Sequence, residues 1–223
     1  MWTNVTIWIK NIKIILKNPI EIITIKNVDV IRMMKKLVVT VILFVVCLVS
    51  NNMAFAGNYE IITSNEKISS SLQALESVNR NDVLAILRGN NATRKPIRVM
   101  FRELEVYGLA NCEAVTMKTQ AGGLVIYINK KHQNAPKEAL ACLIAHESQH
   151  HTQTGTKAEE VRAWVMEVST WNAFVRQNSQ VAYSNSNLVK RLNYIDNVYT
   201  KQQGGVMGIE KVVSNIGMYK GLN

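Results

Sequence analysis

Residues 136–150 read PKEALACLIAHESQH, and this stretch decides the fold. Pro136 can open a helix because the first helical residue needs no N–H. The apolar run that follows predicts a buried helix as far as about Thr152, ended by Gly155. His146 and His150 are four residues apart, so on a helix both rings lie on one face and can reach a single ion.

Glu147 directly follows the first of these histidines, and the turn geometry lets its carboxylate reach a water beside the ion rather than the ion itself. Zinc at such a site lowers the pKa of water towards about 7 and polarises a carbonyl group. We therefore expect Zn²⁺ on His146 and His150, with Glu147 as general base. A chance pair of helix histidines is the alternative.

A third ligand is expected, because catalytic zinc sites usually have three protein ligands. The next predicted helix, residues 157–177, offers Glu159 and Glu160. Thr156 and Glu159 have the spacing of a capping box, which gives Glu159 a structural task. Glu160 lies about 60° from the centre of the apolar stripe of the helix, against roughly 160° for Glu159. Glu160 is the predicted ligand; the alternative is a first-turn acid stabilised by the helix dipole.

These residues resemble the gluzincin class of zincin metallopeptidases, in which HExxH is followed by a glutamate ligand. The resemblance covers roughly residues 97–174 and includes Glu160-Val161-Arg162-Ala163, which is similar to the E-x-x-A of several gluzincins. Only nine residues separate His150 from Glu160, a shorter spacing than in many gluzincins, and this implies a compact member.

The resemblance implies a zinc peptidase that hydrolyses peptide bonds in a peptide or protein, cell-wall peptide included. A zinc-binding envelope or interaction protein of the same fold, without turnover, is the alternative function. The resemblance also implies that the strand before the active helix, Leu124–Asn129, forms the edge of the cleft where substrate pairs. A tyrosine or histidine facing the developing oxyanion is implied as well, and Tyr127, Tyr183, Tyr194 and Tyr199 are unranked candidates.

The remaining pattern predicts an α+β, zincin-like fold that is predominantly helical, with a small antiparallel or mixed sheet. Alternating apolar residues predict a strand near residues 97–102 and a hairpin of residues 114–118 and 124–129 around two glycines. Helical spacing predicts two helices before the sheet and, after the long helix, two more near residues 188–199 and 206–216.

The N-terminal part has the pattern of an export signal. Residues 33–56 combine a basic start, an apolar run of about 14 residues and an Ala-Phe-Ala cleavage site, so we expect cleavage between Ala56 and Gly57. A retained anchor is the alternative, although a spanning helix needs roughly 20 residues. Residues 1–32 are then a non-native extension, and residues 57–223 form one zincin-like domain that is periplasmic or secreted.

The net charge of +10 does not indicate nucleic acid. Half of it lies in residues 1–56, and the rest is spread along the chain without a block of like charges. Partners are therefore expected to be peptide substrates, with the membrane involved only through the signal segment.

A few further residues have weaker signals. Glu167 lies two turns after Glu160 and could orient a ligand histidine, or form a structural salt bridge. His151 is expected beside the site rather than on the metal, and His132 in a solvated loop. Cys112 and Cys142 could form one disulfide in an oxidising compartment, or remain two thiols. Trp164 and Trp171 are expected in the core.

Overall fold

The computed structural model describes residue 38, residues 59–201 and residues 204–219. The residues from 59 to 219 in this set belong to one compact unit, and Val38 belongs to another. The predicted extension 1–32 and, apart from Val38, the predicted signal 33–56 lie outside the described residues.

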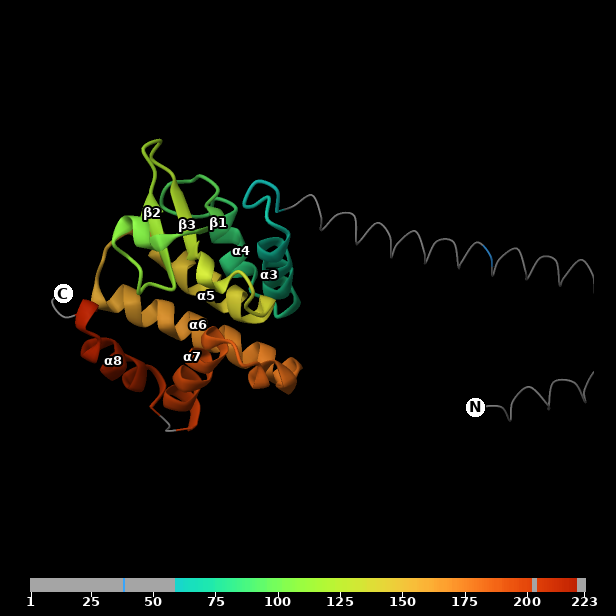
Figure 1. The fold of residues 1–223 in the computed structure, drawn as a ribbon, viewed down its shortest axis with the longest axis vertical. Coiled ribbons are helices and arrows are strands. Elements are labelled where there is room, and N and C mark those ends of the chain that lie inside the picture. Colours follow the sequence, from blue (N-terminus) through green and yellow to red (C-terminus); the bar gives the residue numbers. More distant parts are fainter. Residues whose placement is uncertain (1–37, 39–58, 202–203, 220–223) are drawn as a thin grey trace, which may run out of the picture. The chain divides into compact units, whose positions relative to one another are not determined.

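Two helices begin the described domain, as predicted. α3 (Glu66–Ser77) starts after Asn65, whose side chain accepts hydrogen bonds from two backbone N–H groups of the first turn. α4 (Asn81–Leu87) follows after a short turn and buries three aliphatic side chains. Both helices pack beside the central helix of the fold (Figure 1).

The sheet has three strands in the order β1-β3-β2. β2 (Ala114–Lys118) and β3 (Leu124–Asn129) form the predicted antiparallel hairpin, and its turn has Gly122 at φ 73°, a conformation that favours glycine. β1 (Arg98–Arg102) pairs with β3 in parallel. The predicted mixed α+β fold, predominantly helical with a small sheet, is confirmed.

This strand order corrects one expectation. β3 was expected at the edge of the cleft, but it is the central strand of the sheet. β1 pairs with the side of β3 that faces away from β2. In the described part of the chain, β2 has a strand neighbour on one side only, and it packs against the helix that carries the histidines. The edge beside the site is therefore β2.

α5 (Lys137–Ser148) lies between the sheet and α6 (Lys157–Gln177), as Figure 1 shows. Every residue of α5 from Ala139 to Ser148 is buried. A helix that is apolar all round requires partners on every side, and here the sheet, α3 and α6 supply them. The main core surrounds α5 and includes Trp171 of α6, which is fully buried.

The chain ends in a helical layer on α6. α7 (Asn187–Asp196) is followed by a π-helical turn, Asn197–Lys201, and by α8 (Gly205–Asn215). These elements pack on α6 around a second, smaller apolar cluster that includes Trp164. Among the described helices, none combines the length and apolar character needed to cross a bilayer. The 3₁₀ turns are Leu104–Tyr107, Lys130–His132, Gln149–Thr152, Ser179–Tyr183 and Gly217–Tyr219.

Candidate metal centre

The end of α5 carries the two histidines. His146 and Glu147 lie in its last turn and are buried. The α-helix ends at Ser148, earlier than predicted, and His150 lies in the tighter 3₁₀ turn Gln149–Thr152 that continues it. His150 still stands about one turn beyond His146, with ring centroids 5.3 Å apart.

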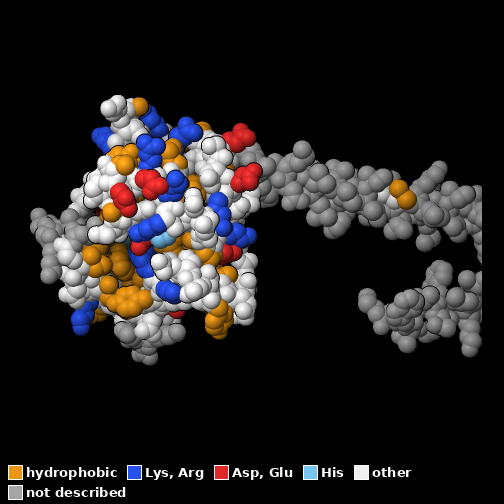
Figure 2. Space-filling model, viewed as in Figure 1, with side chains coloured by type: hydrophobic (Ala, Val, Ile, Leu, Met, Phe, Trp, Pro, Cys, Tyr) orange, Lys and Arg blue, Asp and Glu red, His pale blue; other side chains and the backbone are white. Residues whose placement is uncertain are grey.

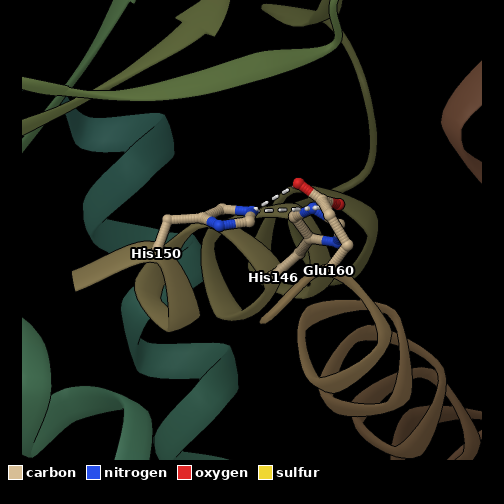
Figure 3. Close-up of side chains that lie close together, drawn as sticks. All are labelled: His146, His150 and Glu160. Carbon is tan, nitrogen blue, oxygen red and sulfur yellow. Dashed lines mark hydrogen bonds and ion pairs between the residues drawn. The ribbon is translucent and has the colours of Figure 1, made fainter. Parts of the chain in front are cut away.

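The structure brings together all three predicted ligands, and their ligand atoms lie within 4.8 Å of one another (Figure 3). The Nε2 atoms of His146 and His150 are 3.4 Å apart. Glu160, in the first turn of α6, has Oε1 3.5 Å from Nε2 of His150 and Oε2 4.0 Å from Nε2 of His146. His151 is not part of this group.

These distances fit a single tetrahedral ion. Two ligands that each lie 2.0–2.1 Å from zinc, at a tetrahedral angle, are about 3.3–3.4 Å apart, and the two Nε2 atoms are 3.4 Å apart. Oε2 of Glu160 is buried and has no hydrogen-bond partner, a costly state for a carboxylate oxygen. Two imidazoles and one such carboxylate are a donor set that suits zinc.

Each histidine has its other nitrogen held by a carboxylate. Nδ1 of His146 is 3.0 Å from Oε2 of Glu167, and Nδ1 of His150 is 3.3 Å from Oε1 of Glu159. In the neutral rings Nδ1–H then donates to the carboxylate, which leaves the Nε2 lone pairs directed at each other. Burial disfavours charge on His146, but the hydrogen bond and charge of Glu167 outweigh it and raise its pKa.

Glu159 does more than the predicted capping. Its backbone N–H donates to the Thr156 hydroxyl at 3.2 Å, as expected, but its carboxylate returns to the N–H of Gly155 at 2.9 Å instead of to that of Thr156. The same carboxylate accepts from the Thr154 hydroxyl. Burial alone would raise the pKa of Glu159, but the bond from Thr154 and the charge of His150 lower it. Glu159 therefore joins the start of α6 to a ligand ring.

Glu167 lies behind His146 and is 1% exposed, so its charge needs a partner. Arg191 of α7 supplies it through a two-point ion pair, with Nη1 on Oε1 and Nη2 2.9 Å from Oε2. Burial by itself would raise the pKa of Glu167, but the charge of Arg191 and the bond to His146 lower it to about 2. Both alternatives predicted for Glu167 are present, since its carboxylate contacts His146, a predicted ligand, and also forms a salt bridge with Arg191.

The predicted base, Glu147, faces the same cleft without joining the ligand triad. The hydroxyl of Thr116, on β2, lies 2.8 Å from Oε2 of Glu147 and 2.8 Å from its backbone oxygen. Glu147 is 5% exposed, and the hydrogen bond from Thr116 ties its carboxylate to the edge strand. No local sequence pattern indicates Thr116, because the two residues lie 31 positions apart.

These groups share a cleft of about 500 Å³. Figure 2 shows histidine near the middle of this face, between acidic and basic side chains. The walls come from the segment before β2, the end of α5, the start of α6 and the C-terminal turn. They include Cys112, Glu113, Thr116, Trp164, Arg191, Ile216 and Tyr219.

Comparison with known proteins gives no relative. No protein-family model, curated protein or solved structure matches this chain.

The tyrosine of the cleft is one that the sequence did not single out. None of the four candidate tyrosines lines the cleft, whereas Tyr219, in the C-terminal 3₁₀ turn, does. Burial and the nearby charge of Glu160 raise the pKa of Tyr219. No local pattern could reveal it, since it lies 59 positions after Glu160 in the chain.

Three expectations about other residues are also resolved. His132 was expected in a solvated loop, but it is buried, and its Nε2 pairs with Glu113 at the start of the hairpin. The 3₁₀ turn after β3 brings this histidine to Glu113, which its polar neighbours in sequence do not reveal. Cys112 and Cys142 are free thiols: Cys142 is buried in α5, and Cys112 lines the cleft. Trp164 belongs to the second apolar cluster, as expected of a core residue, but also borders the cleft.

Proposed function

We propose that the protein is an exported zinc metallopeptidase, a compact relative of the gluzincins. His146, His150 and Glu160 would hold the zinc, and Glu147 would act as general base. The observation that carries this proposal is the 3.4 Å separation of two Nε2 atoms whose Nδ1 atoms are both held by carboxylates. Two lone pairs that converge in this way repel unless a proton or a metal ion lies between them, and the buried Oε2 of Glu160, which has no hydrogen-bond partner, favours a metal ion.

The residues around the triad support hydrolysis. When bound, zinc would supply Lewis acidity to a carbonyl oxygen and acidity to water. Glu147 would accept a proton from the attacking water and later pass it to the leaving nitrogen. Thr116 would hold the carboxylate in place for both transfers through its 2.8 Å hydrogen bond. Without it, Glu147 would have to be reoriented in each turnover.

An extended peptide suits the cleft because β2, which lines it, is an edge strand of the sheet in the described residues. The backbone oxygen of Glu113 accepts a hydrogen bond from the N–H of Asn129 in β3. Because hydrogen-bonded and non-hydrogen-bonded residues alternate along an antiparallel strand, the backbone N–H and C=O groups of Ala114 and Thr116 point away from β3. A substrate strand could add to these groups and pass along the triad. The family resemblance implied such an edge, and the strand order supports β2 for this role.

The test is the isosteric substitution Glu147→Gln. We expect zinc to remain at one equivalent, measured by elemental analysis of untagged protein, while cleavage of a quenched fluorescent peptide library falls by at least about 100-fold. Glu66→Gln, a first-turn acid on the exposed side of α3, is the matched control. Unchanged cleavage in Glu147→Gln would remove this residue from the mechanism.

The alternative is a zinc-binding envelope protein of the same fold without turnover. Equal zinc in the wild type and Glu147→Gln, with no cleavage by either across the library, would favour it. A basic binding protein without metal is the remaining candidate, and zinc well below one equivalent in the wild type would favour that one.

A further inference from the structure

Arg191 reaches the metal centre from a helix that supplies none of its ligands. It lies on α7, 31 positions after Glu160 in the sequence, and its side chain borders the cleft. Both of its terminal nitrogens lie on Glu167, and one face of the guanidinium lies over the Trp164 ring, 4.9 Å from the centroid. The guanidinium is thus fixed both in its plane and perpendicular to it.

The contacts continue from Arg191 to the ligand through one oxygen. Oε2 of Glu167 accepts from Nη2 of Arg191 at 2.9 Å and from Nδ1 of His146 at 3.0 Å. Because a two-point pair sets the plane of the carboxylate, it also sets the direction in which Oε2 meets the imidazole. A movement of Arg191 would therefore change the orientation of the His146 ring.

The other ligand histidine is held differently. Glu159, which faces His150, is fixed by the Gly155 N–H and the Thr154 hydroxyl, groups of the turn that leads into α6. Glu167 lies mid-helix, where backbone N–H groups are already used within the helix. Among the described residues, Arg191 is the one cation paired with it.

We infer that Arg191 is a positioning residue of the metal centre, acting through Glu167 to fix the ring of His146. This inference depends on the proposed function only in that the triad binds zinc. It assigns α7 a role in metal binding, although α7 contributes no ligand. Substrate binding by Arg191 is the competing role, but both terminal nitrogens of its guanidinium are already occupied.

The experiment measures the zinc affinity of the full chain by competition with a chromophoric chelator, and circular dichroism at the same temperature shows whether each variant is folded. Arg191→Met should weaken zinc binding by about 10–100-fold, as expected for loss of a residue that orients a ligand. Arg191→Lys should recover only part of the loss, because an ammonium cannot pair at two points in a plane. Lys190→Met, an exposed neighbour on the same helix, should stay within about twofold of the wild type.

A second set of variants separates positioning from folding. Glu167→Gln should weaken zinc binding to a similar extent, and the double variant Glu167→Gln with Arg191→Met should be no weaker than either single variant. In Arg191→Met the buried carboxylate of Glu167 has lost its cation, which could prevent folding. The double variant has no such unpaired carboxylate, so it should fold even if Arg191→Met does not. In the cobalt-substituted protein, the visible spectrum should change in each of these variants and not in Lys190→Met.

Distinct results would overturn the inference. Zinc affinity of Arg191→Met within about twofold of the wild type, an unchanged cobalt spectrum, or additive losses in the double variant would each show that Arg191 does not act through Glu167. A wild type that binds less than a few tenths of an equivalent of zinc would instead overturn the proposed function.

Discussion

Glu160→Gln and Glu159→Gln should weaken zinc binding to different extents, although the two residues are neighbours. Oε1 of Glu160 lies 3.5 Å from Nε2 of His150, on the side where the lone pairs converge. Glu159 contacts the opposite nitrogen, Nδ1, at 3.3 Å. If the triad holds zinc as proposed, removal of Glu160 removes a ligand and the only carboxylate of the triad, whereas removal of Glu159 removes a support of a ligand.

The magnitudes follow from these positions. Loss of a supporting carboxylate costs about 10–100-fold in metal affinity, which is about 1.4–2.7 kcal/mol. Loss of Glu160 should exceed this range, because two neutral imidazoles then face a divalent ion without an anionic ligand. Glu66→Gln, another first-turn acid, should leave affinity unchanged and serves as the control.

Chelator competition gives the affinities, and thermal unfolding gives an independent check. Zinc at 100 times its Kd stabilises a folded protein by about 2.7 kcal/mol, which in a domain of about this size raises Tm by roughly 5–11 °C. The wild type and Glu66→Gln should show this shift, and Glu160→Gln should show almost none at the same zinc concentration. If Glu159→Gln loses zinc as completely as Glu160→Gln, or more so, the assignment of the third ligand is wrong.

Three further predictions concern the groups around the triad. Thr116→Val should leave zinc content unchanged but lower the free energy of unfolding in urea by about 1–3 kcal/mol, because the buried carboxylate of Glu147 loses a donor. Zinc affinity should fall by at least about tenfold per pH unit in acid, because protons compete with zinc for the ligand nitrogens. Since the pKa of His146 is raised above the ordinary histidine value of 6.5, this fall should begin above pH 6.5. An onset below pH 6.5 in chelator competition would contradict the prediction. The ionised carboxylate of Glu167 should stabilise the zinc-free protein fully above pH 4.5, and this stabilisation should be lost as the pH falls towards about 2. The free energy of unfolding in urea should therefore depend less on pH between these values in Glu167→Gln than in the wild type.

The sequence was most informative where local rules decide the structure. α6 has the predicted limits, Lys157–Gln177, because a capping threonine begins it and a stripe of apolar side chains continues along it. The hairpin of β2 and β3 follows from alternating residues around a glycine turn. Within the site, HExxH spacing and the inward angle of Glu160 sufficed to predict the three groups that the fold brings together.

What the sequence did not reveal depends on contacts between distant segments. The parallel pairing of β1 with β3, which makes β2 the edge, joins residues that lie 27 positions apart in sequence, such as Val99 and Ile126. His132 has polar neighbours in sequence, but is buried because the turn after β3 directs it towards Glu113. Arg191 lies on α7, and the sequence pattern of α7 indicates only which face of the helix packs in the core. No neighbouring residue in sequence therefore connects Arg191 to the candidate site.

The position of Arg191 has an electrostatic reason beyond geometry. Glu147, Glu159, Glu160 and Glu167 all lie around a small, mostly buried volume, and each is needed there for a different contact. Like charges at such distances raise one another's cost of ionisation, and a protonated carboxylate would be a poor ligand, base or support. The guanidinium of Arg191 on Glu167, which is 1% exposed, lowers that cost, and under the proposed function one helix, α6, would then supply a ligand and both supporting acids.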